Sequence, residues 1–214
     1  MNWAEKYRPH TLKDLYLSSK NKNEIIKWIE DKQHNKKSHK NCLILHGPPG
    51  IGKTSVANII LKQYNYDVIE FNSSEIKTKK EIVENLQKIN GNNNILNMMS
   101  QEKKQMGIII DELDGLNDKS VIKELLTFIK KKNSSPFICT TNSVNKKIMT
   151  LNSKSIYIKI PKPSRLQVSL LIDKISLNEK MNLSNEIKTL ILNKSQLDFR
   201  RVINLLEYIN IENK

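Results

Sequence analysis

Five short apolar runs lie between residues 42 and 160, and the segments that separate them repeat apolar residues at helical spacing. Two of the runs, CLILH and GIIID, are continuously apolar, as expected of parallel strands that helices cover on both faces. This alternation of strands and helices predicts a five-stranded parallel α/β sheet. The predicted strands are residues 42–46, 67–72, 107–111, 136–140 and 155–160, the predicted helices are 54–64, 79–89 and 120–131, and a mobile polar loop is expected at 90–105.

The pattern changes after the segment IPKP, residues 160–163. Three segments with helical spacing follow, at 165–180, 185–193 and 198–210, and no further strand is predicted. Ser164, Ser184 and Asp198 precede them and are suited to cap a helix N-terminus. We therefore expect an α/β domain at residues 1–160 and a small all-helical domain at 161–214.

Composition limits the class of protein. The hydrophobic fraction is 38% and the charged fraction 27%, as in soluble globular proteins. No apolar run approaches the roughly 20 residues that span a bilayer, and the N-terminus lacks a signal-peptide segment, so we expect an intracellular protein without a membrane role. The net charge of +14 favours a polyanionic partner, although lysine-rich composition also follows from AT-rich coding.

Both cysteines, Cys42 and Cys139, fall within predicted strands. We interpret them as small core residues, because a zinc site needs more cysteine or histidine at ligand spacing.

The segment GPPGIGKT matches the pattern G-x-x-x-x-G-K-[ST] of a phosphate-binding loop. It follows a predicted strand and precedes a predicted helix, which is the context that the motif requires. Backbone N–H groups of such a loop surround phosphate oxygens, the lysine reaches the β- and γ-phosphates, and the threonine can bind Mg²⁺. The predicted nucleotide-binding residues are Gly47, Pro48, Pro49, Gly50, Ile51, Gly52, Lys53, Thr54 and Ser55.

Two further strand ends carry polar residues. IIIDELDGL ends an apolar strand in Asp111 and Glu112, which suits a metal-binding carboxylate followed by a general base. Asp114 has a weaker claim and suits a turn or the start of a helix. FICTTNS ends another strand in Thr141 and Asn142, and an amide there can orient water against a phosphate.

The three motifs in this order, followed by a helical region with arginine near a helix start, resemble an AAA+ ATPase with a helical lid. WAEKYRP, residues 3–9, resembles the N-terminal signature of clamp-loader ATPases, the replication factor C family. EFNSSE, residues 70–75, resembles the segment that follows the second strand in that family, and LDFRRVINLLE, residues 197–207, resembles its sensor 2 helix.

The resemblance implies a role for each motif residue. Lys53 and Thr54 would bind phosphate and Mg²⁺, and Asp111 would hold the metal. Glu112 would be the catalytic base, Asn142 sensor 1 and Arg200 sensor 2. The segment Tyr7, Arg8 and Pro9 would pack near the adenine of ATP, or would form an ordered arm that does not touch the ligand.

Arg200 and Arg201 lie off the apolar stripe of the last predicted helix, which Phe199, Val202 and Ile203 begin. A cation at a helix start is unfavourable unless an anion neutralises it. The resemblance implies that Arg200 reaches the γ-phosphate from the lid, and Arg201 has the weaker claim.

The chain departs from the family at one motif. Small subunits of clamp loaders carry Ser-Arg-Cys, and the equivalent stretch here is Ser153-Lys154-Ser155. Lysine cannot reproduce a bidentate guanidinium contact. With DELDGL and NSSEIKTKKEIVENL, this favours the family's large subunit, which receives an arginine from a neighbour and donates none. No collar domain follows the sensor 2 helix, which leaves a fragment or a reduced protein as alternatives.

The predicted function is ATP hydrolysis within a sliding-clamp loader during DNA replication, with weak activity in isolation. The resemblance implies other clamp-loader subunits, a sliding clamp and primer–template DNA as partners, at a nuclear or a viral or cytoplasmic replication site. The alternatives are an ATP-binding scaffold with little turnover and an alternative or checkpoint clamp loader. Two lysine clusters, at 32–40 and 129–135, are interpreted as solvated faces.

Overall fold

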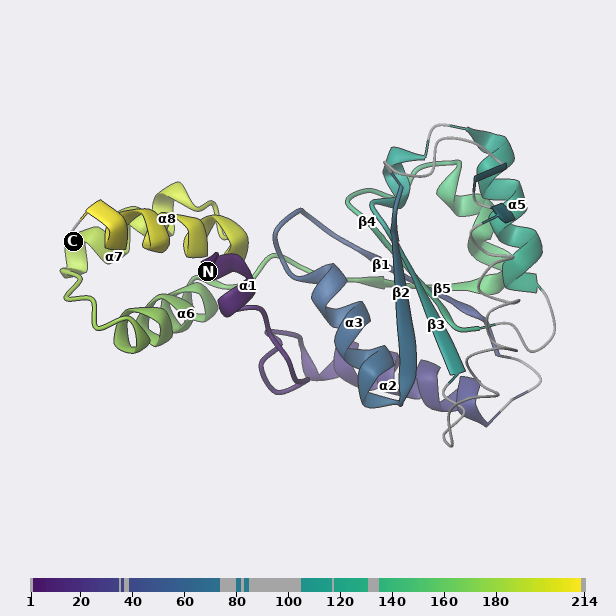
Figure 1. Cartoon of the computed structure of the whole chain (residues 1–214), viewed down its shortest axis with the longest axis horizontal. Helices are drawn as coiled ribbons and strands as arrows, with labels where there is room; N and C mark the ends of the chain where they lie inside the picture. The colour runs from purple at the N-terminus through teal and green to yellow at the C-terminus, as the bar shows by residue number, and fades with distance from the viewer. Residues whose placement is uncertain are drawn as a thin grey trace.

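The structure is a computed structural model that describes residues 2–34, 36, 39–73, 80–81, 83–84, 105–116, 118–130 and 135–212. Figure 1 shows a twisted sheet with helices on both faces and, at the other end of the long axis, a cluster of helices that includes the N-terminus. None of the described helices combines the length and the apolar character needed to cross a bilayer.

The sheet has five parallel strands in the order β2-β3-β4-β1-β5. This confirms the predicted five-stranded α/β fold, and each strand lies within two residues of its predicted bounds. β1 and β4 occupy the interior of the sheet and β5 one edge, so the strand that enters the glycine-rich loop is covered on both sides. The bounds are β1 Cys42–His46, β2 Tyr66–Asn72, β3 Gln105–Asp111, β4 Phe137–Thr141 and β5 Ser155–Lys159.

Side chains of the central strands alternate between two cores. Leu43, Leu45 and Ile109 pack with helices α2 (Ser19–Gln33) and α3 (Lys53–Gln63). Cys42 and Ile110 point to the other face, which α5 (Lys119–Lys130) and the 3₁₀ segment η2 (Ile148–Lys154) cover. Burial on both faces explains why these strands read as unbroken apolar runs. Both cysteines are buried, as predicted.

Helix α2 is absent from the sequence-based prediction. The Ser18 side chain caps it by accepting a hydrogen bond from the Asn21 N–H. Ile25, Trp28 and Ile29 are buried at helical spacing, yet the mean polarity of the segment conceals this stripe. The predicted helix at 79–89 and the predicted loop at 90–105 lie mostly outside the described residues. Within them, residues 80, 81, 83 and 84 are helical, and Gln105 begins β3.

Three helices follow the sheet, α6 (Arg165–Asn178), α7 (Asn185–Lys194) and α8 (Phe199–Glu212). Ser164 and Ser184 cap α6 and α7, as predicted. The short helix α1 (Trp3–Lys6) packs into the core of this helical cluster, where Trp3 is buried. The backbone N–H of Trp3 donates to Glu207 Oε1 at 3.2 Å. The N-terminal arm is therefore held by the C-terminal helices.

Candidate nucleotide-binding site

The glycine-rich loop connects β1 to α3. Gly50 (φ 69°) and Gly52 (φ 89°) adopt the left-handed conformation that only glycine reaches without strain. Gly52 is the N-cap of α3 and offers no side chain to cap it, and the first turn, KTSV, contains no acidic residue. The N–H groups at the start of α3 are therefore open to an anion.

The Lys53 side chain folds back over this loop. Its Nζ donates hydrogen bonds to the carbonyl oxygens of Gly47 and Pro48, both at 2.8 Å, and to Asn142 Oδ1 at 2.9 Å. Among the described residues, all three acceptors are neutral. Burial lowers the pKa of Lys53, and the nearby charge of Asp111 opposes that shift. A buried ammonium whose direct acceptors are neutral is suited to receive an anion.

Thr54 and Asp111 meet at the end of the sheet. Thr54 Oγ1, in the first turn of α3, donates to Asp111 Oδ1 at 2.9 Å. A hydroxyl and a carboxylate suit Mg²⁺, which binds few protein oxygens and completes its shell with water and phosphate. The described residues contain no cluster of three or more carboxylate, histidine or cysteine side chains, so they offer no all-protein metal cage.

Glu112 follows Asp111 with a left-handed backbone (φ 55°), which is unusual for a residue with a side chain. Its N–H donates to Thr140 Oγ1 at 3.2 Å, and its carbonyl oxygen accepts from Ser73 Oγ at 2.6 Å. The Glu112 side chain is exposed at the carboxyl end of the sheet. Neither Thr140 nor Ser73 is recognisable as a site residue from the sequence, because each contacts a residue distant in the chain.

Asn142 lies directly after β4 and joins two parts of the site. Its side chain accepts the hydrogen bond from Lys53, and its N–H donates to Asp114 Oδ1 at 3.3 Å. Asp114 lies in the 3₁₀ segment η1 (Leu113–Gly115) and contributes negative charge near Lys53. The residue assigned to a turn is thus also part of the site, which short-range patterns in the sequence did not indicate.

The start of α8 docks against the glycine-rich loop. The Phe199 N–H donates to the Gly50 carbonyl oxygen at 3.0 Å. Asp198 caps α8 by accepting from the Arg201 N–H at 3.0 Å, as predicted, and a Cβ at Gly50 would lie 1.9 Å from its carboxylate. The loop and the helix therefore approach so closely that only glycine fits between them.

The two adjacent arginines have different surroundings. Arg201 donates to Gln196 Oε1 at 3.2 Å and lies 3.9 Å from Asp198 Oδ2. Arg200 is exposed and makes no hydrogen bond or ion pair within the described part of the chain. Its positive charge nevertheless contributes to lowering the pKa of Lys53, so the two cations face the same region.

The first residues of the N-terminal segment, Trp3 and Tyr7, pack with the C-terminal helices. Tyr7 packs against the helical core, and its hydroxyl donates to Glu179 Oε1 at 2.5 Å. Burial and this carboxylate raise the pKa of Tyr7 to about 12. Arg8 pairs with Glu5 at 3.3 Å in its own turn. A role of Tyr7, Arg8 and Pro9 next to adenine stays a prediction.

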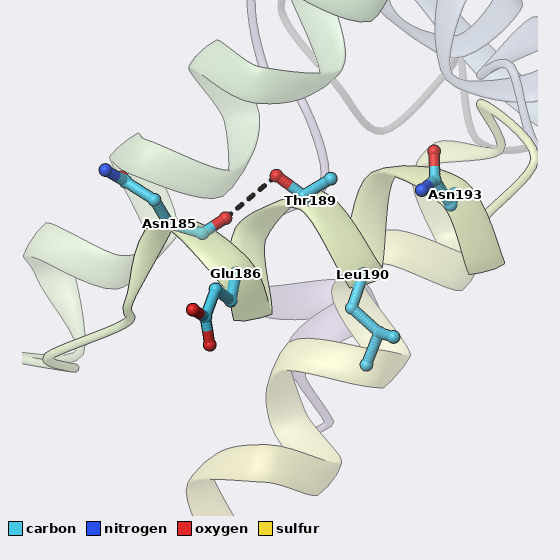
Figure 2. A pocket seen from close by; sticks show the side chains of 5 residues that line it. All are labelled: Asn185, Glu186, Thr189, Leu190 and Asn193. Atoms are coloured by element: carbon cyan, nitrogen blue, oxygen red, sulfur yellow. Dashed lines mark hydrogen bonds between the residues drawn. The ribbon is translucent and has the colours of Figure 1, made fainter.

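Lys154 is exposed at the end of η2, immediately before the edge strand β5. A surface groove of about 450 Å³ lies elsewhere, on α7. Figure 2 shows that the side chains lining it diverge: Glu186 and Leu190 point away from Asn185 and Thr189. The groove therefore lacks the converging polar groups of a catalytic site.

The comparisons with known proteins agree with the sequence motifs. The family described as "ATPase family associated with various cellular activities (AAA)" matches residues 43–161. The replication factor C large subunit of Methanococcus aeolicus is 31% identical over 100% of this chain and 44% of its own length. Replication factor C subunit 1 of Schizosaccharomyces pombe is 29% identical over 95% of this chain and 24% of its own length. The predicted resemblance to the large subunit is confirmed, and the chain spans less than half of these relatives.

The fold also matches solved structures. The RuvB Holliday junction branch migration motor of Thermotoga maritima superposes with a TM-score of 0.68 at 18% identity, covering 94% of this chain and 64% of that one. At this level of identity the match concerns the fold alone, and it confirms the architecture of a five-stranded sheet followed by helices.

Proposed function

The chain belongs to the AAA family of ATPases, and from that premise we propose that it binds and hydrolyses ATP as a large-subunit-like component of a sliding-clamp loader. One observation carries the ATPase part of the proposal. Lys53, Thr54, Asp111 and Asn142, from three separate segments, are joined by hydrogen bonds at the uncapped start of α3. We infer that this arrangement is the binding site for the phosphates of ATP.

Each residue has a role that fits its surroundings. The N–H groups of the glycine-rich loop and the start of α3 hold the phosphates, and Lys53 exchanges its neutral acceptors for phosphate oxygens. Thr54 and Asp111 would hold Mg²⁺ beside the phosphates. Bound Mg²⁺ would supply positive charge that stabilises the phosphate oxygens and the ADP leaving group. The protein's contribution is to fix these groups before the nucleotide arrives.

Glu112 is proposed as the general base. Its exposed carboxylate follows the metal-binding aspartate, so it takes the proton from a water that attacks the γ-phosphate. Asn142 orients that water from the neighbouring strand. Lys53 and Arg200 stabilise the negative charge that develops on the phosphoryl oxygens.

The C-terminal helices are proposed as a lid domain, at 161–214, that reports on the nucleotide. Arg200 has no direct partner among the described residues and contributes to the electrostatic environment of Lys53, which supports a sensor 2 role. A γ-phosphate between the two cations would draw α8 towards the loop. Tyr7, Arg8 and Pro9 are proposed to line the adenine side, because their arm packs with the same helices.

The clamp-loader part of the proposal rests on the relatives. Large subunits of replication factor C match the chain along nearly all of its length, and the net charge of +14 suits a DNA partner. The proposed partners are small clamp-loader subunits, a sliding clamp and primer–template DNA at sites of DNA replication. Lys154, in place of an arginine, supports a subunit that donates no arginine to a neighbour's ATP site.

The test is ATP hydrolysis by the chain alone and with partners. The partner subunits and clamp would be recovered by co-purification from the native source and added with primed single-stranded DNA. We expect slow hydrolysis alone and a large stimulation by the assembled set. Hydrolysis that responds to none of these additions would rule out the clamp-loader assignment and leave the ATPase assignment.

A second candidate function is an ATP-binding scaffold that hydrolyses ATP very slowly. Lys154 favours it, because a lysine does not replace the arginine that stimulates hydrolysis between subunits. The variant Glu112→Gln separates the two functions. Under the ATPase proposal it binds ATP as the parent chain does and loses turnover. Equal, very slow turnover in both proteins, even with partners present, would favour the scaffold.

A further inference from the structure

Glu112 has a strained backbone that its neighbours must hold. Its φ of 55° lies in the left-handed region, which is unfavourable for a residue with a Cβ. Such conformations persist where surrounding contacts determine them, and they concentrate at functional sites. The contacts that hold this backbone therefore also determine where the Glu112 carboxylate points.

One of these contacts comes from β4. Thr140 is 1% exposed, and its Oγ1 accepts a hydrogen bond from the Glu112 N–H at 3.2 Å. The same hydroxyl donates a short hydrogen bond to Asp111 Oδ1, the oxygen that also accepts from Thr54. A single buried hydroxyl therefore orients the carboxylate of Asp111 and the backbone of Glu112 together.

The second contact comes from the end of β2. Ser73 is 4% exposed, and its Oγ donates to the Glu112 carbonyl oxygen at 2.6 Å. Its own N–H donates to the Asp111 carbonyl oxygen at 3.0 Å, which fixes the position of Ser73 beside β3. Gly115 leaves room for this serine, because a Cβ on Gly115 would lie 2.6 Å from Ser73 Oγ.

The sheet order explains why these contacts come in a pair. β3 lies between β2 and β4, so Ser73 and Thr140 approach the end of β3 from opposite sides. Together they bond the N–H and the C=O on either side of the Glu112 Cα, and the same C=O also accepts from the Gly115 N–H at 2.7 Å. Both hydroxyls are buried and have no water as an alternative partner, so burial fixes the orientation of each one.

We infer that Thr140 and Ser73 form a hydroxyl clamp that sets the position of the Glu112 carboxylate, and that Thr140 also orients Asp111 for metal binding. This rests on the proposed ATPase function. The two residues are positioning residues, because they act through Glu112 and Asp111 and do not touch the reacting atoms. EFNSSE, a motif without an assigned role in the proposed chemistry, contributes Ser73 to the site.

The experiment measures turnover and nucleotide affinity in Thr140→Val, Thr140→Ser and Ser73→Ala. Misplacing a catalytic group by about 1 Å can cost about 100-fold in rate. We expect kcat to fall about tenfold or more in Thr140→Val and Ser73→Ala, with an ATP dissociation constant within about twofold of the parent chain. Thr140→Ser keeps the hydroxyl and should retain most of the rate.

Two matched controls remove buried hydroxyls that do not touch Glu112. Ser176 is 6% exposed and donates to the Ile172 carbonyl oxygen within α6, and the buried Ser155 hydroxyl has no hydrogen-bond partner among the described residues. Ser176→Ala and Ser155→Ala should hydrolyse ATP at the parent rate. Thermal unfolding of all variants separates a lost fold from a misplaced carboxylate.

Magnesium dependence tests the contact with Asp111 without relying on turnover. In Thr140→Val, tight binding of a non-hydrolysable ATP analogue should require severalfold more Mg²⁺, whereas Ser73→Ala should not change this requirement. An unchanged Mg²⁺ requirement in Thr140→Val would overturn the Asp111 part of the inference.

The remaining outcomes separate this inference from the proposed function. Suppose that Glu112→Gln is inactive while Thr140→Val and Ser73→Ala hydrolyse ATP at the parent rate. The hydroxyl clamp is then wrong, and the ATPase assignment stands. If the parent chain never hydrolyses ATP, the ATPase assignment fails. Crystal structures of Thr140→Val and Ser73→Ala then test the hydroxyl clamp. A Glu112 φ that stays near its parent value in both variants would overturn it.

Discussion

The two sides of the candidate site differ in how firmly their side chains are held. On the sheet side, the buried Lys53 donates hydrogen bonds to the Gly47 carbonyl oxygen at 2.8 Å and to Asn142 Oδ1 at 2.9 Å. Beside it, Thr54 Oγ1 donates to Asp111 Oδ1 at 2.9 Å. On the side of the C-terminal helices, the proposed lid, Arg200 is exposed and has no direct partner among the described residues. Under the proposed function, the sheet side is arranged in advance for phosphate, whereas the lid side needs the ligand to complete its contacts. This difference suits a site in which one half binds and the other half responds.

The largest expected effect is on the sheet side. Glu112→Gln should lower ATP turnover about 100-fold or more, because a general base contributes roughly that factor, and should leave ATP affinity nearly unchanged. Steady-state hydrolysis and equilibrium binding measure the two quantities. The exposed Glu186 of α7 provides a matched control, and Glu186→Gln should behave as the parent chain. Full turnover in Glu112→Gln would contradict the assignment.

The contact between the two sides is tested next. Gly50→Ala adds a Cβ that meets the Asp198 carboxylate at 1.9 Å on a left-handed backbone, so we expect a loss of about 2 kcal/mol or more in unfolding free energy. Gly52→Ala is the control, because its backbone is also left-handed but nothing lies within 4 Å of the added atom. Chemical denaturation without nucleotide should show the larger loss at Gly50. Equal losses would mean that α8 does not dock on the loop in solution.

The adjacent arginines sharpen the comparison within the lid. Arg200→Ala should lower turnover about tenfold or more, since it removes a cation that stabilises transferring phosphate. Arg201→Ala should change turnover less than about twofold, because that side chain is engaged by Gln196 and Asp198. Steady-state kinetics at saturating ATP make the comparison. Similar losses in the two variants would undo the assignment of sensor 2 to Arg200.

The smallest effect concerns the arm that packs on the lid. Tyr7→Phe removes the hydrogen bond to Glu179 and should lower the unfolding free energy by about 1 kcal/mol. The pKa of Tyr7 rises from 10.0 to about 12 on folding, so this stabilisation is complete below pH 10 and is lost as the pH rises towards 12. Denaturation of the parent chain and of Tyr7→Phe at pH 8 and pH 11 tests this. A parent chain and a Tyr7→Phe variant with the same pH dependence would contradict it.

Local patterns in the sequence predicted much of the sheet. The five strands were found because burial on both faces leaves an apolar run that polar residues terminate. Helix α2 was missed because its buried residues Ile25, Trp28 and Ile29 lie among many charged ones. The capping residues Ser164, Ser184 and Asp198 were found, since a cap acts within one turn of its own helix.

The candidate site also has a part that local patterns predict and a part that they do not. Gly52, Lys53 and Thr54 could be predicted because a phosphate-binding loop is continuous in the chain. The Lys53 hydrogen bond to Asn142 and the Thr140 contacts with Asp111 and Glu112 were not predictable from spacing, because they depend on which strands become neighbours. A polar residue at a strand end has the same local pattern whether it belongs to a loop or to a site.

The sequence by itself determined the five strands, the three C-terminal helices, the glycine-rich loop and the family, because these depend on contacts within a few residues or on continuous motifs. Only the tertiary structure decided which distant groups meet at the end of β3. The strand order places β3 between β2 and β4, and this brings Ser73 and Thr140 to the two sides of Glu112. The physical reason is that strand order and register are set by burial of the whole sheet, and side chains such as Thr140 acquire their role from that arrangement.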